Sequence, residues 1–180
     1  MVSPDRRRFL QSLAAWPTAL ALPALAQTAA PQARLRLGLI GTGLRGQVLL
    51  RELLQRDDVD VAALCDIEPL MLARALAQLE KAGRPRPFTC GEDRDPSAYR
   101  RLLAQRGLDG VIIATPWEWH AVMAVDAMEA RVPVGCEVVA GVTLQDHWDV
   151  LRTQQRTGTP YMLLENVCYR RDVMAVLRMV

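Results

Sequence analysis

Hydrophobic side chains follow two alternating patterns from residue 35 to the end of the chain. Short, nearly continuous apolar runs predict six strands, at 35–40, 59–65, 88–90, 111–114, 134–136 and 161–164. Between and after them, apolar residues three or four positions apart predict helices at 46–55, 69–81, 96–106, 119–130, 143–157 and 170–180. Strands and helices therefore alternate along the chain.

Residues that start and stop helices support these boundaries. Pro69 stands at the start of one predicted helix, and Thr143 is suited to cap the start of another. Gly83, Gly107 and Gly158 follow the ends of three helices, where a left-handed backbone favours glycine.

The strands are continuous apolar runs rather than alternating ones, which is typical of a parallel sheet buried on both faces. Right-handed crossovers through the helices then give a doubly wound order. We therefore predict an α/β fold, a doubly wound parallel sheet of the Rossmann type, over residues 35–169. In the helix over 143–157 we expect a core stripe of Leu144, Trp148 and Leu151.

Composition narrows the classes of function. The chain has 180 residues, of which 51% are hydrophobic and 23% charged, with a formal net charge of +2. Such a chain is predicted to form one globular domain, and with Lys81 as its single lysine it has no basic stripe for nucleic acid. The cysteines lie far apart without a C-x-x-C motif, so we expect no metal site and interpret them as small core residues: Cys65, Cys90, Cys136 and Cys168.

Residues 1–26 have the pattern of an export signal. The letters DRRRFL precede an apolar stretch that ends in ALA, a small-x-small cleavage site. The arginine pair resembles that of a twin-arginine signal, which predicts a periplasmic protein exported in the folded state, with 27–34 as a linker. A general secretory signal and an uncleaved anchor are the alternatives, although Pro17 and Pro23 disfavour stable insertion into a membrane.

A glycine-rich loop connects the first predicted strand to the first predicted helix. Its sequence is Gly41-Thr42-Gly43-Leu44-Arg45-Gly46. Gly41 permits a tight turn, Gly43 lets a diphosphate approach the backbone, and Gly46 lets the helix pack on the strand. Amides at the helix start would bind the phosphates. The loop predicts a dinucleotide site, against the alternative of a glycine-rich turn in an unrelated α/β protein.

Asp66, which closes the second strand, bears on the choice of dinucleotide. Its carboxylate would accept hydrogen bonds from the adenosine ribose and repel a 2′-phosphate, so NAD is favoured over NADP. Arg45 leaves NADP open, because its guanidinium could pair with that phosphate.

Aromatic and polar side chains gather after the fourth strand. In a doubly wound sheet, ligands lie beyond the carboxyl ends of the strands, where the strand order reverses. The residues expected to line this crevice are Thr115, Trp117, Glu118, Trp119 and His120. The two indoles would wall the nicotinamide and offer a face to a sugar, and the helix dipole would favour a neutral His120. Packing of the indoles and capping by the histidine are the alternatives.

The ends of the fifth and sixth strands add polar groups to the same rim. Glu137 and Asn166 would hold the nicotinamide ribose or its amide, with a purely structural role as the alternative for each. Tyr169 is the candidate catalytic residue, as a proton donor or a substrate contact, and simple packing is equally compatible with its position.

These motifs together show a resemblance to a known family. The glycine-rich loop, TPWEWH, CEV and ENVCY resemble the Gfo/Idh/MocA oxidoreductase superfamily, and within it the NAD-dependent α-N-acetylgalactosaminidases of glycosyl hydrolase family 109. The similarity covers Leu35 to Val180. It implies NAD as the cofactor, in contact with Leu44, Arg45, Asp66, Trp117, Glu118, Trp119, His120, Glu137, Val138 and Asn166.

Two departures from the family pattern matter. Val139 stands where the family usually has a proline, so we expect a less rigid turn there. Family members also carry a second, C-terminal α+β domain that closes over the sugar and supplies a catalytic histidine. The resemblance implies that this domain is missing, that 170–180 is its start, and that the chain is the front part of a longer protein.

The resemblance further implies a glycosidase that recycles its cofactor. Hydride passes from the sugar C3 to NAD, a base removes the C2 proton, the aglycone leaves, water adds and the hydride returns. The substrate would be a small-molecule glycoside, and this chain alone would bind NAD with little activity.

One alternative function is that of an NAD(P)-dependent sugar dehydrogenase, against which the lack of a lysine after Glu137 counts. The other is an NAD-binding module without activity, and assembly into a homo-oligomer is left open.

Overall fold

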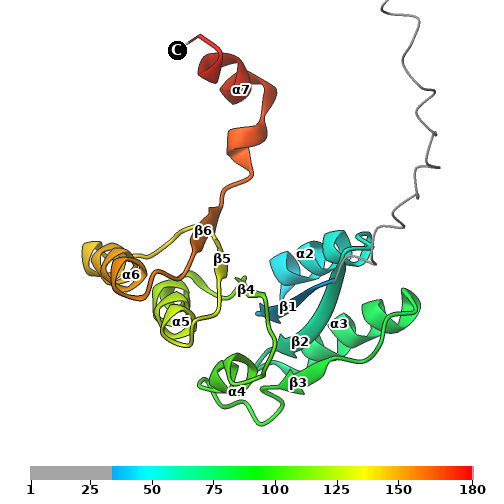
Figure 1. Ribbon diagram of the computed structural model, residues 1–180. Helices are drawn as coiled ribbons and strands as arrows, with labels where there is room; N and C mark the ends of the chain where they lie inside the picture. Colours follow the sequence, from blue (N-terminus) through cyan, green and yellow to red (C-terminus); the bar gives the residue numbers. More distant parts are fainter. Residues whose placement is uncertain (1–33, 180) are drawn as a thin grey trace, which may run out of the picture. The chain divides into compact units, whose positions relative to one another are not determined.

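The computed structural model of the protein describes residues 34–179. Its centre is one six-stranded sheet in which neighbouring strands are parallel. The strand order β3-β2-β1-β4-β5-β6 reverses between β1 and β4 (Figure 1). This confirms the predicted α/β fold with a doubly wound parallel sheet. The strands are β1 Leu35–Ile40, β2 Val59–Cys65, β3 Phe88–Cys90, β4 Gly110–Ile113, β5 Val134–Glu137 and β6 Tyr161–Leu164.

Helices connect the strands, as the alternating pattern predicts. The helix predicted over 96–106 is shorter, because Asp95 accepts hydrogen bonds from the amide and hydroxyl of Ser97 and forms a turn before the helix begins. The last helix, predicted over 170–180, is Arg171–Leu177 and follows a short 3-10 turn. In the described residues the helices are α2 Leu44–Leu54, α3 Pro69–Lys81, α4 Tyr99–Leu103, α5 Trp117–Glu129, α6 Leu144–Thr157, the 3-10 helix η2 Val167–Tyr169 and α7 Arg171–Leu177.

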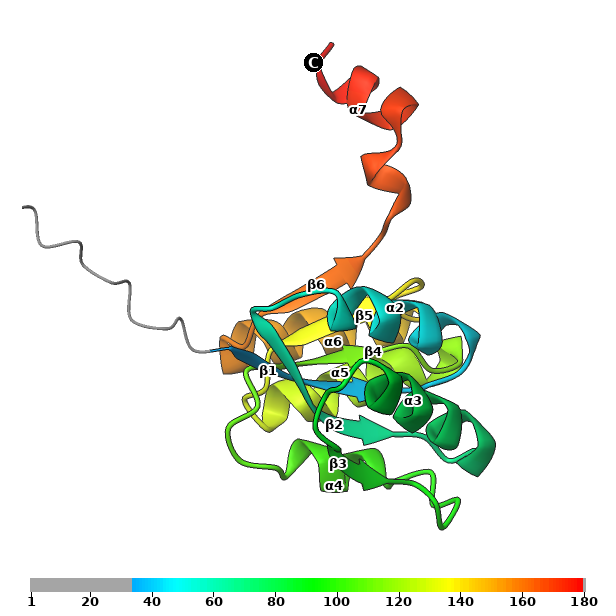
Figure 2. The same ribbon diagram turned by 90° about the vertical axis from the view of Figure 1, so that its right-hand side faces the viewer.

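Helices cover both faces of the sheet (Figures 1 and 2). On one face, α2 and α3 pack on a core that includes Leu39 and Leu64. On the other face, α4, α5 and α6 pack on a core that includes Ile40 and Ile113. Consecutive residues of β1 thus contribute to opposite cores, as the two-residue period of a strand requires.

The predicted caps of α6 are confirmed. Thr143 Oγ1 accepts a hydrogen bond from the amide of Asp146 (3.1 Å), and Asp146 accepts one from the amide of Thr143 (2.8 Å). This reciprocal pair is a capping box, which satisfies amides at the start of the helix. Gly158 follows the end of the helix with a φ of 68°.

The predicted core stripe of α6 is wrong. Leu144, Trp148 and Leu151 are all exposed. The helix turns other side chains to the interior: Val150, Thr153 and Thr157. Apolar spacing pointed to the wrong face because threonine counts as polar in the pattern, although its methyl group packs well once its hydroxyl has a partner.

Two predictions fall on residues that the structure does not describe. The export signal at 1–26 and nearly all of the linker at 27–34 lie outside residues 34–179. Within that described range, no helix combines the length and apolar composition needed to cross a membrane.

Candidate functional site

The loop between β1 and α2 has two positions where only glycine fits. Gly41 has a φ of +88°, and a Cβ there would lie 2.6 Å from the carbonyl oxygen of Ala114, which follows β4. A Cβ on Gly46 would overlap the carbonyl oxygen of Gly41. The loop therefore brings α2 close to the ends of β1 and β4, where the strand order reverses.

Gly43 is different, because a side chain there would meet open space. An added Cβ has no heavy atom of the described residues within 4 Å. Gly43 is the N-cap of α2, and among the described residues no side chain caps this helix. The first amides of α2 are therefore accessible to an anion, and the residues present fit the diphosphate of a dinucleotide.

Asp66 lies at the end of β2 and is bonded to the glycine-rich loop. Its Oδ2 accepts hydrogen bonds from the amide of Thr42 (2.6 Å) and from the hydroxyl of Thr42 (2.9 Å). Its Oδ1 accepts one from the amide of Glu68 (2.8 Å). A carboxylate has about four acceptor sites, of which these bonds use three, so Asp66 Oδ1 can still accept a hydrogen bond from a ribose hydroxyl.

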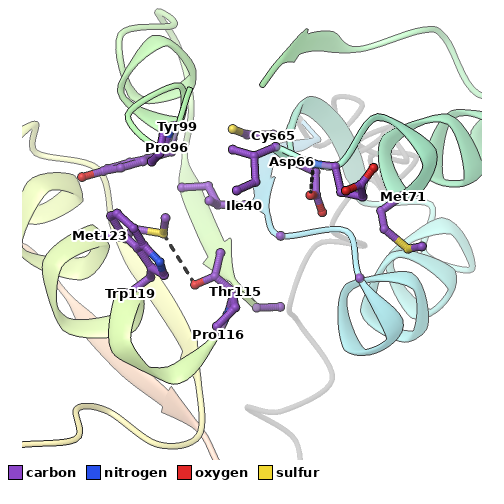
Figure 3. A pocket seen from close by; sticks show the side chains of 15 residues that line it. Ile40, Cys65, Asp66, Met71, Pro96, Tyr99, Thr115, Pro116, Trp119 and Met123 are labelled. Atoms are coloured by element: carbon purple, nitrogen blue, oxygen red, sulfur yellow. Dashed lines mark hydrogen bonds between the residues drawn. The ribbon is translucent and has the colours of Figure 1, made fainter. Parts of the chain in front are cut away.

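A cleft of about 480 Å³ opens beside Asp66, at the carboxyl ends of β1, β2 and β4. Figure 3 shows Asp66 and Met71 on one wall and Trp119 and Met123 on the opposite wall. A mainly apolar cleft with a few polar groups is typical of a small-molecule site. The cleft brings together these predicted cofactor residues: Gly41, Gly43, Asp66, Thr115 and Trp119.

The sequence does not predict several other residues of this cleft, namely Ile67, Glu68, Met71, Pro96, Tyr99 and Met123. Ile67 and Glu68 directly follow Asp66, so their position after the carboxyl end of a strand is a signal that could have found them. Tyr99 and Met123 carry no such signal, because they lie within helices and only packing brings them to the cleft.

The two tryptophans differ from the prediction that both wall the nicotinamide. Trp119 lines the cleft beside Asp66, the residue predicted to bind the adenosine ribose (Figure 3). Trp117 is 60% exposed and does not line this cleft. Residues two positions apart on a helix point in nearly opposite directions, so the start of α5 cannot turn both indoles to one ligand.

Tyr99 closes the apolar side of the cleft. Its hydroxyl donates to Asp126 Oδ2 at 2.6 Å, and Arg100 Nε donates to the same oxygen at 2.9 Å. Burial, followed by the pairing with Asp126, raises the pKa of Tyr99 to about 12. The phenol therefore stays protonated near neutral pH, and its ring serves as a wall.

Arg45 and Glu137 connect the glycine-rich loop to the end of β5. Arg45 Nε donates to Glu137 Oε1 at 2.8 Å, and Nη2 lies 2.7 Å from the same oxygen. The Glu137 side chain is 8% exposed and that of Arg45 is 41% exposed. The pair directs Arg45 toward β5 and away from Asp66 on β2, which weakens the alternative in which Arg45 binds the 2′-phosphate of NADP.

Replacing Arg45 by methionine is expected to lower the free energy of unfolding by about 2 kcal/mol, because Glu137 would remain as a buried carboxylate without its partner. The double variant Arg45→Met/Glu137→Gln should recover part of this loss. Urea unfolding of the double-mutant cycle measures both effects. Arg170→Met, which breaks an exposed ion pair with Asp172, is the control. An equal loss of unfolding free energy in Arg170→Met would contradict the expectation that burial of Glu137 makes its ion pair matter more.

The side chain of His120 contacts the main chain of two loops at the carboxyl edge of the sheet. It is 1% exposed, with Nδ1 2.6 Å from the carbonyl oxygen of Val139 and Nε2 2.8 Å from that of Thr115. A neutral imidazole donates to one of these oxygens, and only an imidazolium donates to both. The contact holds the turn after Glu137 although Val139 is not a proline. Both ring nitrogens face the main chain, so a cofactor contact by His120 stays a prediction.

The remaining predicted site residues do not line the cleft. Tyr169, the candidate catalytic residue, is 72% exposed on η2. Gly46 is buried beneath the loop, Val138 is half-buried, and the others are exposed at the rim: Leu44, Glu118 and Asn166. Their roles stay predictions.

Several known proteins have sequences similar to this one. The family model described as "Oxidoreductase family, NAD-binding Rossmann fold" (Gfo/Idh/MocA) matches residues 35–164. A glycosyl hydrolase family 109 protein of Stenotrophomonas maltophilia is 63% identical over 180 residues, which are 100% of this chain and 39% of that protein. An α-N-acetylgalactosaminidase of Tannerella forsythia is 45% identical over 149 residues, 81% of this chain and 31% of that protein. The chain thus spans less than half the length of these relatives.

Solved structures share the fold. The WlbA dehydrogenase of Bordetella pertussis, in complex with NADH and UDP-GlcNAcA, has a TM-score of 0.66 at 21% identity, over 81% of this chain and 41% of its own. An oxidoreductase of Agrobacterium radiobacter, in complex with NAD+, L-tartaric acid and magnesium, has a TM-score of 0.67 at 26% identity, over 82% of this chain and 41% of its own. Because the loop and cleft fit a dinucleotide and the family model covers most of the described residues, the chain belongs to the Gfo/Idh/MocA oxidoreductase family and forms an NAD-binding Rossmann domain similar to that of glycosyl hydrolase family 109 proteins.

Proposed function

We propose that the protein is the NAD-binding domain of a glycosidase that hydrolyses α-N-acetylgalactosaminides and recycles NAD in every turnover. The 45% identity to the Tannerella forsythia α-N-acetylgalactosaminidase carries this proposal. The residues after Glu137 also support a hydrolase over a net dehydrogenase, because Val138 and Val139 stand where many superfamily dehydrogenases have a catalytic lysine.

Different residues of the loop and cleft would bind different parts of NAD. The first amides of α2, beyond Gly43, would bind the diphosphate. Asp66 would accept hydrogen bonds from the adenosine ribose, and its charge would disfavour NADP. Trp119 and the apolar residues around it would exclude water from the adenosine half of the site. Glu137 and Asn166 are proposed to hold the nicotinamide ribose or its amide.

When bound, NAD supplies the chemistry that these side chains lack, because it can take a hydride from the sugar C3 and return it later. Oxidation makes C3 a ketone, which acidifies the C2 proton. Transfer of that proton to a base and cleavage of the C1–O bond, with a proton delivered to the leaving oxygen, would release the aglycone, after which water would add to C1 and a proton would return to C2. Tyr169 is the proposed proton donor or substrate contact within this chain.

Hydrolysis of p-nitrophenyl α-N-acetylgalactosaminide tests the reaction. We expect the Stenotrophomonas maltophilia relative to release nitrophenol while NADH does not accumulate. The 180-residue chain is expected to bind NAD in a calorimetric titration but to release little nitrophenol, because it spans 39% of that relative and the resemblance assigns most sugar contacts elsewhere. NADH that accumulates in proportion to the sugar consumed would contradict the proposal and favour a sugar dehydrogenase.

We also propose that the protein is exported to the periplasm in the folded state. The motivation is the arginine pair Arg6 and Arg7 ahead of an apolar stretch. A cofactor that is recycled can remain bound where no free pool supplies it, so folding around NAD before export suits the proposed reaction. Cell fractionation, with both arginines replaced by lysine as the control, tests this proposal, and unchanged periplasmic recovery of that control would argue against it.

A further inference from the structure

Cys65 and Cys90 lie side by side at the carboxyl ends of β2 and β3. They are partners in the register of these two strands, so their side chains share one face of the sheet. Adjacent strands are about 4.8 Å apart, within the separation of about 4.4–6.8 Å that a disulfide requires between its Cα atoms. Each cysteine is 3% exposed. The pair is therefore a buried dithiol with the spacing of a disulfide.

The dithiol is directly connected to the NAD site. Cys65 lines the cleft next to Asp66 and Ile40 (Figure 3). The carbonyl oxygen of Cys65 accepts a hydrogen bond from the amide of Gly41 at 2.8 Å, and that of Cys90 accepts one from the amide of Asp66 at 3.2 Å. The main chain of both cysteines thus positions the residues predicted to bind the two ends of the adenosine diphosphate.

The pairing shifts the pKa values of the two thiols in opposite directions. Interaction with Cys65 lowers the pKa of Cys90, and the charge of Arg101 adds to this effect. The same pairing, together with burial, raises the pKa of Cys65. The thiolate is the nucleophile in thiol oxidation, so we assign the first attack to Cys90 and the completion of the bond to Cys65.

We infer that Cys65 and Cys90 are a modification site at which a thiol-specific diazene oxidant forms an intramolecular disulfide, and that bound NAD protects it. The Cys90 thiolate adds to one nitrogen of the N=N bond, and the other nitrogen takes a proton. The Cys65 sulfur, after losing its proton, attacks Cys90 Sγ and displaces that nitrogen, which takes the second proton. The dithiol loses two electrons and two protons, and the diazene becomes a hydrazine.

The position of β3 provides access to these buried thiols. β3 is an edge strand of 3 residues, and short edge elements open more readily than the centre of a sheet. NAD would contact Gly41 and Asp66, whose amides are bonded to the two cysteines, so it would hold this edge closed. Protection of the thiols by NAD rests on the proposed binding of NAD to the cleft, whereas disulfide formation in the free protein does not.

Diamide treatment of the Cys168→Ser variant tests the inference. Cys168 is exposed, so its prediction as a core residue is wrong, and its removal leaves the three buried thiols. After denaturation and alkylation, we expect mass spectrometry to detect Cys65 and Cys90 joined in one linked peptide pair. Cys136 is the matched control. It lies in the same row of the sheet and is buried, but its register partner on β4 is Ile113, so it should remain a free thiol.

A parallel sample with NAD at ten times its dissociation constant, as measured by calorimetry, should form the disulfide about tenfold more slowly. Cys90→Ser in the same background should abolish the link. Free Cys65 and Cys90 after treatment, or oxidation of Cys136 at the same rate, would overturn the inference, the second because it indicates global unfolding. A link that forms equally fast with NAD bound would overturn the protection, and a calorimetric titration without heat would instead identify a failure of cofactor binding.

Discussion

Alanine at position 43 is expected to weaken NAD binding strongly while the free protein remains as stable as the original chain. A Cβ on Gly43 meets no described atom within 4 Å, so the substitution adds no strain to the folded state. The methyl group would nevertheless occupy the space through which a diphosphate reaches the first amides of α2. We expect the affinity for NAD to fall by at least about 100-fold. The free energy of unfolding should stay within about 0.5 kcal/mol.

Gly46→Ala is the matched control, because it adds the same methyl group to the same loop. Its Cβ would overlap the carbonyl oxygen of Gly41, so we expect a loss of stability of about 3 kcal/mol together with the loss of binding. Calorimetric titration and urea unfolding of both variants separate the two effects. Unchanged NAD affinity in Gly43→Ala would show that the diphosphate does not lie against the start of α2.

Asp66→Ala is expected to reduce the affinity for NAD by about 10- to 100-fold, since hydrogen bonds to a charged carboxylate contribute about 1.5–3 kcal/mol. The affinity for NADP should fall less, because the substitution also removes the charge that repels a 2′-phosphate. Titrations of both dinucleotides measure the change in their ratio. That ratio is the informative quantity, because losing the bonds to Thr42 and Glu68 also destabilises the free loop.

Asp109→Ala is the matched control for Asp66→Ala. Asp109 Oδ2 accepts a hydrogen bond from the amide of Arg36 at 2.7 Å, at the amino end of β1 rather than in the cleft. Its removal should weaken the fold through the same kind of bond while leaving NAD affinity unchanged. The role of Asp66 as the ribose ligand fails if both variants bind NAD as the original chain does.

The sheet and its phosphate-binding loop could be predicted because local sequence encodes them. Strands β1 and β2 are mostly apolar runs, each with one charged residue near its start (Arg36 and Asp60), and the predicted ranges 35–40 and 59–65 match the structure. Gly41 and Gly46 mark close approaches of the main chain that exclude any side chain. The boundary of α4 could not be read in this way, because a side-chain turn at Asp95 replaces its first residues.

Side-chain partners across the sheet lie beyond such local patterns. Arg45 and Glu137 are 92 positions apart, and their pairing follows only from the order of β1, β4 and β5. The direction of Trp119 is likewise set by packing, since the sequence places it in the crevice but does not show that it lines the same cleft as Asp66. Periodicity also predicted the wrong buried face for α6. Its apolar residues Leu144 and Trp148 are exposed, whereas the helix buries two threonines that the pattern counts as polar.

The bond from the Thr42 amide to Asp66 has a consequence for how fast the site fills. The Gly41 amide is likewise bonded to the carbonyl oxygen of Cys65, so the loop is held at consecutive positions before any ligand arrives. A preorganised loop loses little conformational entropy on association. Uptake of the dinucleotide should then follow a single kinetic phase set by diffusional encounter, without a slow rearrangement of the backbone.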